Sequence, residues 1–61
     1  MSSYETYQIR AKSHFAKPVM TLSASTPYFT VMDKAREIKE KDFPNDEVYV
    51  VSVKEVVIST F

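Results

Sequence analysis

The residue types that most often carry catalytic or metal chemistry are nearly absent from this 61-residue sequence. It has one histidine, His14, and no cysteine. A single imidazole is too few ligands for a structural metal site, and without cysteine there is neither a thiolate zinc site nor a disulfide. The serines have no base assigned to them, and no pair of carboxylates is expected to converge. We therefore expect no enzymatic activity, no bound cofactor and no metal.

Glycine is absent as well. Phosphate-binding loops, dinucleotide-binding fingerprints and nucleophile elbows need glycine where the backbone turns sharply or approaches a ligand closely. None of these sites forms in its usual shape without it. The sequence therefore favours a binding protein over an enzyme.

The basic residues near the start of the chain offer one kind of binding chemistry. From Thr6 to Met32 the sequence has no acid and a formal charge of +3. Positive charge interleaved with aromatic rings, here Tyr7 and Phe15, suits the backbone and the bases of nucleic acid. This interpretation predicts an RNA- or DNA-contacting accessory protein that uses a basic strand and loop: Arg10, Lys12, His14 and Lys17. Alternatively, these residues are ordinary solubilising groups that protect a strand edge.

The overall charge weighs against the nucleic-acid interpretation. The formal net charge is zero, because residues 33–61 carry a compensating −2 and Glu5 adds one more acid. A balanced total argues against general affinity for nucleic acid. A protein partner is therefore the first hypothesis, and RNA or DNA is the alternative.

The chain is organised around its last fifteen residues, 47–61, of which six are valine. β-Branched residues at this density favour an extended strand, which we expect over about 47–60. The apolar residues do not alternate cleanly with polar ones, so both sides of the strand carry apolar side chains. Either both faces are covered, or one apolar face is left for a partner.

One helix covers only one side of that strand. The two candidate inward sets are Tyr49 with Val51 and Val53, and Val48 with Val50. We expect the other set to face outward beside residues of the first strand: Thr6, Gln8, Arg10 and Lys12. An apolar strip with positive charge beside it and a long strand edge suits association with another protein. The predicted protein-binding residues are Arg10, Lys12, Val48, Val50, Lys54, Val56 and Ile58.

Two earlier segments, 4–12 and 19–25, alternate apolar and polar residues and are predicted to be strands. The segment between them lacks the turn chemistry of a tight hairpin, so a looser loop is expected. Residues 27–41 are predicted to form a helix, with Thr26 capping its first amides and Pro27 in its first turn. Its predicted inward stripe is Tyr28, Val31, Met32, Ala35 and Ile38, and its predicted ion pairs are Arg36–Glu40 and Glu37–Lys41.

The order strand, strand, helix, strand predicts one α+β domain over residues 1–61. A short loop makes the first two strands antiparallel, and the helix returns the chain by a right-handed crossover. With the third strand beside the first, the sheet has the order 2-1-3 and is antiparallel throughout. The helix packs on one face of this three-stranded sheet.

Three stretches resemble a known family: LSAST before the helix, KAREI within it, and FPNDEVYVVSVK after it. Together with the β-β-α-β order and the small size, they look like small early proteins of tailed bacteriophages, in particular the T7-type inhibitor of bacterial RNA polymerase. In that family, basic residues on the last strand contact the polymerase. Lys54 matches one such position, whereas Ser52 stands where the family pattern has a positive charge. The resemblance implies a small phage-encoded inhibitor of a host protein.

The N-terminal sequence lacks the apolar core of a signal peptide, and no apolar run is long enough to span a membrane. We therefore expect a cytoplasmic location, which is the host cytoplasm for a phage protein, and no membrane partner. The expected protein partner is a host protein or a second copy of the chain in a homodimer.

Overall fold

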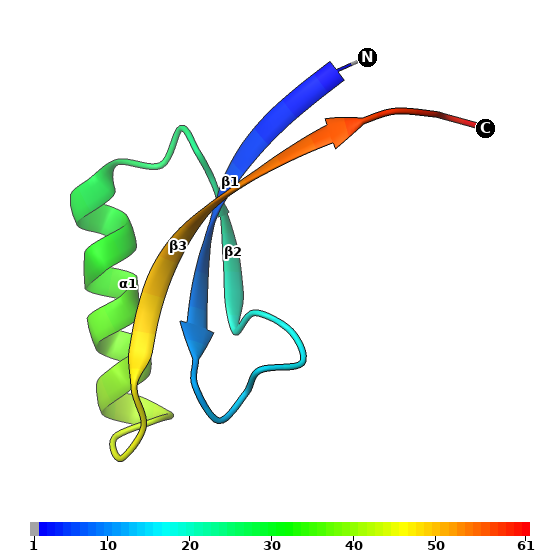
Figure 1. Ribbon diagram of the computed structural model, residues 1–61. Helices are drawn as coiled ribbons and strands as arrows, with labels where there is room; N and C mark the ends of the chain where they lie inside the picture. The colour runs from blue at the N-terminus through cyan, green and yellow to red at the C-terminus, as the bar shows by residue number, and fades with distance from the viewer. Residues whose placement is uncertain (1) are drawn as a thin grey trace.

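The fold is seen in a computed structural model that describes residues 2–61 (Figure 1). Strands β1 (Ser2–Ala11) and β2 (Met20–Ser23) precede the helix α1 (Tyr28–Lys41), and strand β3 (Val48–Val57) follows it. The strands form an antiparallel sheet in the order β2-β1-β3. The predicted α+β class, element order and sheet order are confirmed.

Two strands are shorter than the sequence predicts. Strand β2 ends at Ser23 rather than residue 25, because a turn begins there: the Ser23 carbonyl accepts the Thr26 N–H at 3.0 Å and its hydroxyl accepts the Ser25 N–H at 3.2 Å. Strand β3 ends at Val57, which pairs with Ser2, rather than at residue 60. Strand β1 reaches residue 2, two residues earlier than expected.

The helix begins one residue later than predicted. Pro27 is its N-cap, its carbonyl accepts the N–H groups of Thr30 and Val31, and no side chain caps the first turn. The predicted Thr26 cap is therefore wrong, because Pro27 takes the N-cap position and Thr26 lies one residue before it.

On the exposed side of the helix, one of the two predicted ion pairs is present. The Lys41 Nζ lies 3.0 Å from the Glu37 Oε1, as predicted, and this contact lowers the pKa of Glu37. The Arg36 guanidinium pairs instead with Asp33, at 2.8 Å, one turn toward the N-terminus. Positions three and four residues away both lie within reach on a helix surface, so the sequence alone does not select between them.

The hydrophobic core lies between α1 and the sheet. It consists of Ile9 and Ala11 from β1 and of Val31 and Ile38 from α1. Ile9 and Ala11 are two positions apart in a strand, and Val31 and Ile38 are seven apart in a helix, so each pair projects from one face. Four buried side chains among residues 3–61 make a small core, so each one carries a large share of the packing energy.

A polar cluster closes the end of the domain where α1 meets β3. The Asp46 carboxylate accepts the Ser13 N–H at 2.8 Å, the Ser13 hydroxyl and the Glu47 N–H at 2.9 Å. The Lys39 ammonium donates to the carbonyls of Pro44, at 3.1 Å, and of Asp46. These bonds tie the α1–β3 connection to the β1–β2 loop and so fix where β3 starts.

The Ile38→Ala variant should lose about 2–5 kcal/mol of unfolding free energy, because it opens a cavity in this small core. Chemical denaturation followed by circular dichroism measures the loss. The matched control is Phe29→Ala, on the same helix but 70% exposed, which should change stability by about 0.5 kcal/mol or less. A loss below about 1 kcal/mol for Ile38→Ala would mean that this helix face is not the packed one.

Stability should also depend on pH through Asp46. Hydrogen bonds from the Ser13 hydroxyl and then from its N–H lower the pKa of Asp46 below its ordinary 3.8. The bound carboxylate therefore stabilises the fold above that pH, and the contribution disappears as the pH falls through the lowered value. The melting temperature of Asp46→Asn should lie below that of the wild type at neutral pH and converge with it in acid. Ser13→Ala should behave in the same way. A difference in melting temperature that stays constant at every pH would contradict the role given to the Asp46 carboxylate.

Candidate functional site

The register of the sheet decides which side of β3 faces the helix. Val48 pairs with Ala11, and Val50 pairs with Ile9. Residues paired across antiparallel strands project from the same face. Since Ile9 and Ala11 are buried in the core, Val48 and Val50 also lie on the helix side. These two predicted binding residues are therefore not part of the open face of the sheet.

The open face carries the other candidate set. Tyr49, Val51 and Val53 stand beside Arg10, Gln8 and Thr6 of β1, respectively. The Arg10 guanidinium donates to the Gln8 Oε1 through two nitrogens, at 3.1 and 2.6 Å, which lays it along this face. The expected neighbours of the outward set on β1 are thus present, except that Lys12 lies just beyond the strand and is exposed.

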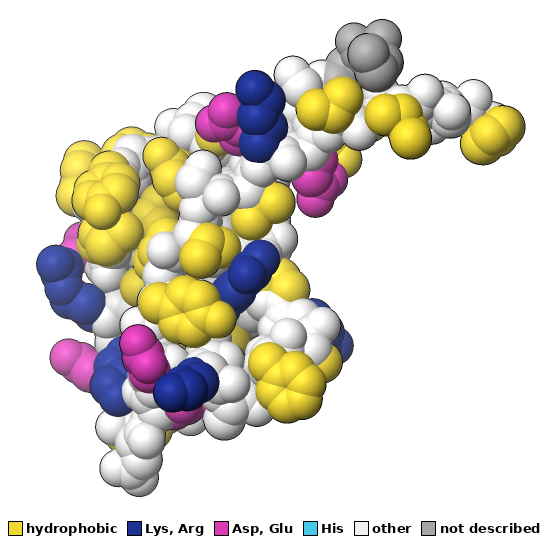
Figure 2. Space-filling model, viewed as in Figure 1, with side chains coloured by type: hydrophobic (Ala, Val, Ile, Leu, Met, Phe, Trp, Pro, Cys, Tyr) yellow, Lys and Arg dark blue, Asp and Glu magenta, His cyan; other side chains and the backbone are white. Residues whose placement is uncertain are grey.

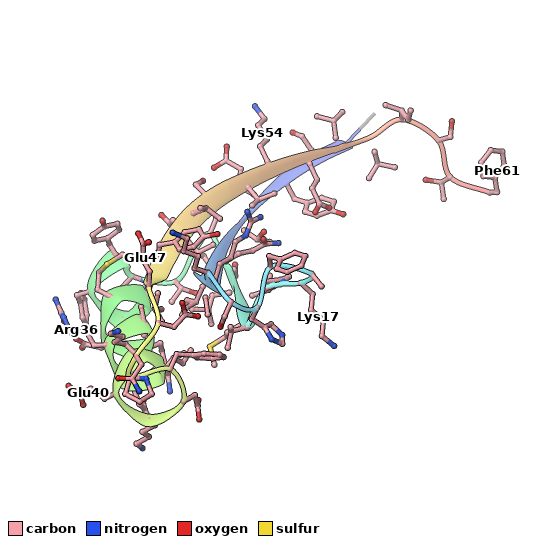
Figure 3. All side chains as sticks on the ribbon, turned by 60° about the horizontal axis from the view of Figure 1, so that its bottom comes forward. Lys17, Arg36, Glu40, Glu47, Lys54 and Phe61 are labelled. Atoms are coloured by element: carbon pink, nitrogen blue, oxygen red, sulfur yellow. The ribbon has the colours of Figure 1, made fainter. Side chains whose placement is uncertain are left out.

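The loop between β1 and β2 brings most of the predicted nucleic-acid residues together. A cavity of about 190 Å³ lies between this loop and the open face, and its lining includes Arg10, His14, Phe15, Lys17 and Tyr49. The His14 ring also lies 6.2 Å from the Phe43 ring, and Figure 3 shows the Lys17 side chain projecting away from the strands. Lys12 is not among the lining residues. The cavity therefore joins three of the four predicted residues to two aromatic rings.

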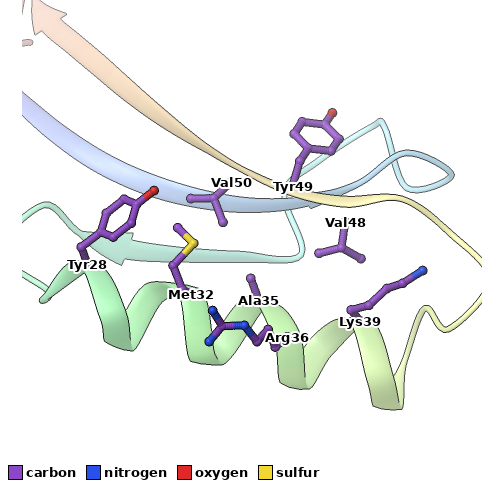
Figure 4. A pocket seen from close by; sticks show the side chains of 8 residues that line it. All are labelled: Tyr28, Met32, Ala35, Arg36, Lys39, Val48, Tyr49 and Val50. Atoms are coloured by element: carbon purple, nitrogen blue, oxygen red, sulfur yellow. The ribbon is translucent and has the colours of Figure 1, made fainter.

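A larger hollow lies between α1 and β3. It has a volume of about 390 Å³ and is lined by Tyr28, Met32, Ala35, Arg36, Lys39, Val48, Tyr49 and Val50. We call it the α1–β3 groove. In Figure 4, Val48 and Val50 point from β3 toward the helix, whereas the Tyr49 ring points away from it. Six of the eight lining residues are aliphatic, Met or Tyr, and Tyr28 and Lys39 lie at opposite ends of the groove (Figure 4).

The main chain of β3 has an unoccupied edge beside this groove. Among residues 2–61, β3 pairs only with β1. The Glu47 carbonyl accepts the Lys12 N–H at 2.9 Å, so the main-chain groups of Glu47 point toward β1. Along a β-strand the N–H and C=O groups of successive residues point alternately to the two sides. The main-chain groups that point away from β1, toward the open edge, are therefore those of Val48, Val50, Ser52, Lys54 and Val56.

The far half of the β1–β3 ladder stands clear of the rest of the molecule. Strand β2 pairs only with Thr6–Ile9, so residues 2–5 and 54–57, which we call the arm, have no third strand. Figure 1 shows the arm extending past α1 and β2 toward both termini. The radius of gyration is 13.2 Å, against about 10.5 Å for a compact chain of this length. The arm accounts for this elongated shape.

Apolar side chains of the arm and of the residues after it are exposed. Val56 is 51% exposed and Ile58 is 80% exposed. In the space-filling view, hydrophobic side chains stand along this projection next to charged ones (Figure 2). The Lys54 side chain points outward from it (Figure 3), and the Glu55 carboxylate raises the pKa of the Tyr4 hydroxyl by hydrogen bonding. The predicted residues Lys54, Val56 and Ile58 thus all lie on an exposed projection.

Sequence reasoning missed the part of the site that the helix contributes. Tyr28 and Met32 belong to the predicted inward stripe, yet they line an open groove, and Tyr28 is exposed. Helical spacing places both residues on the inward face, but it does not show that this part of the helix lies beside the edge strand β3.

Among residues 2–61, no group of three or more His, Cys, Asp or Glu side chains is arranged to hold a metal ion. Within the same residues, no helix is both long enough and apolar enough to cross a membrane. Comparison with models of protein families, with curated proteins and with solved structures finds no match to this chain.

Proposed function

We propose that this chain is a small non-enzymatic protein-binding module that adds an extended segment of its partner to the open edge of β3. The observation that carries the proposal is that this edge runs directly beside the α1–β3 groove. Val50 belongs to both, since its main-chain groups face the edge while its side chain lines the groove.

Edge addition uses two kinds of contact. Main-chain hydrogen bonds to the outward groups of β3 supply affinity for any extended segment, and pockets for alternate side chains supply selectivity. In an added strand every second side chain points to the helix side of the sheet. Those side chains enter the α1–β3 groove, so the partner segment should carry apolar residues at alternate positions.

The charges near the groove are largely engaged already. Arg36 pairs with Asp33, and Lys39 is held by the carbonyls of Pro44 and Asp46. An apolar segment therefore meets cations that already have hydrogen-bond partners, and its binding should depend weakly on salt. The resemblance to phage inhibitors supports a bacterial host protein as one source of such a segment, with Lys54 beside the same edge.

A second candidate function rests on the cavity under the β1–β2 loop. There Arg10, His14 and Lys17 surround exposed aromatic rings, which suits stacking on a single-stranded nucleic acid. Against it, Arg10 is partly engaged by Gln8. The net charge of the chain is also zero. This function is therefore the weaker of the two.

The Ser52→Pro variant tests the edge. The N–H of Ser52 points away from β1, so proline removes an edge donor without removing a bond of the ladder. The immobilised variant should lose the proteins that the wild type captures from a bacterial lysate, as measured by quantitative mass spectrometry. Its circular dichroism spectrum should stay that of the wild type. Val51→Pro is the matched control, because the N–H of Val51 points toward β1 and its loss should unfold the sheet. A folded Ser52→Pro variant with unchanged captures would refute the proposal.

Salt dependence separates the two candidate functions. Nucleic-acid binding through the loop cavity would weaken steeply as salt rises, because counterions are released from the phosphates. We expect a fluorescent single-stranded oligonucleotide to show no saturable anisotropy change at physiological salt. Saturable binding that is lost in Lys17→Glu but kept in Lys34→Glu, a lysine on the exposed helix side, would favour the nucleic-acid function instead.

A further inference from the structure

We propose that the segment taken up by the β3 edge is the C-terminal half of β3 from a second copy of this chain, in a two-fold symmetric dimer. This inference rests on the proposed function and names its partner. The chain itself carries both halves of the contact: an apolar strand end without cover, and an apolar groove beside an open edge.

The two halves do not meet within one chain. They lie on β3 and just past its end, and Ile58 comes eight positions after Val50, which is about 26 Å of extended chain. A two-fold axis across β3 reverses the strand direction in the second copy. Each arm then lies along the groove of the other copy, and both contacts form at once.

The directions of the main-chain groups restrict the register. In an antiparallel pair, residues that exchange hydrogen bonds must both have outward groups. On β3 these are the even-numbered residues from Val48 to Val56. Even-numbered residues must therefore face even-numbered residues of the second copy, and the two-fold axis passes through a pair of identical residues.

Repulsion between like charges disfavours three of the registers whose axis lies near the middle of β3. An axis at Lys54 places two ammonium groups opposite each other, and an axis at Glu55 does the same with two carboxylates. An axis at Val51 sets Glu47 opposite Glu55 of the second copy. Like charges directly opposite each other destabilise a sheet, so these three registers are disfavoured.

The remaining choice lies between axes at Ser52 and at Val53. An axis at Ser52 leaves Lys54 facing the apolar Val50 of the second copy on the groove side. The charged–apolar pair of the Val53 register, Glu55 with Val51, lies on the open face. An axis at Val53 instead places Val50 opposite Val56 and Val48 opposite Ile58. Since Val48 and Val50 line the α1–β3 groove, the second copy's Val56 and Ile58 then point into it, and Lys54 faces Ser52. The geometry therefore points to the register centred on Val53.

The surface area is of the size that a dimer needs. The chain exposes 4732 Å², whereas a compact monomer of 7.0 kDa exposes about 4,000 Å². The excess of about 700 Å² is close to the roughly 800 Å² that each partner buries in a standard interface. With a net charge of zero, two copies also approach each other without long-range repulsion.

Sedimentation equilibrium tests the dimer. The wild type should have twice the 7.0 kDa mass of the chain. Ile58→Glu would place a carboxylate in the apolar groove of the second copy, so it should raise the dimer dissociation constant about tenfold or more. Phe15→Glu is the matched control: it introduces the same charge at an exposed apolar residue of the β1–β2 loop, and it should leave the constant unchanged.

A cysteine cross-link tests the register. The chain has no cysteine, so a single Val53→Cys substitution forms a disulfide only with another copy. At the axis the two Val53 positions form a non-hydrogen-bonded pair with Cα atoms about 4.5 Å apart, which is within disulfide range. Val53→Cys should therefore give a covalent dimer on mild oxidation. Val51→Cys, on the same side of the strand but roughly 13 Å from its own copy, should not.

The outcomes separate this inference from the proposed function. A wild type that stays monomeric at its highest soluble concentration overturns self-association, while loss of captured proteins in Ser52→Pro would still support edge binding. A dimer that is insensitive to Ile58→Glu, or that cross-links through Val51→Cys and not Val53→Cys, overturns the interface proposed here. A dimer lost in both Ile58→Glu and Ser52→Pro supports both proposals.

Discussion

Each residue of β3, from Val48 to Val57, pairs with a residue of β1, from Ala11 to Ser2. This ladder fixes the orientation of every other part of the structure. Strand β2 adds only four pairs to the other edge of β1, and α1 rests on the side chains that the ladder presents. Because Ile9 and Ala11 are the buried side chains of the sheet, their register with Val50 and Val48 also decides which face of β3 the helix covers.

The arm is exposed because β2 is much shorter than β1 and β3. The ladder runs over ten residues on each strand, whereas β2 has four residues. The helix and β2 therefore cover one end of the ladder and leave the arm exposed. A two-stranded ribbon without a packed face is only marginally stable in water. The arm thus gains most from a partner, and the groove at the covered end offers an apolar place to bind one.

The chemistry of the two candidate surfaces differs in kind. Along the β3 edge, main-chain groups and aliphatic side chains dominate, and the two cations that line the groove, Arg36 and Lys39, already have partners. Under the β1–β2 loop, cationic and aromatic side chains dominate around a smaller cavity. Binding at the β3 edge depends mainly on shape and hydrogen bonding, whereas binding under the β1–β2 loop depends mainly on electrostatics. Added salt should therefore weaken binding under the loop more than binding at the edge.

The sequence by itself determined the elements and their order, because the periods of Tyr7, Ile9 and Ala11 and of Val31 and Ile38 are local properties of strand and helix. It also named Lys54, Val56 and Ile58 as candidate protein-binding residues. It left open which valines of β3 face the helix, because both sides of that strand are apolar. Only the pairing of Ile9 with Val50 decided this. The α1–β3 groove likewise depends on the tertiary packing of α1 beside β3, because its lining comes from both elements.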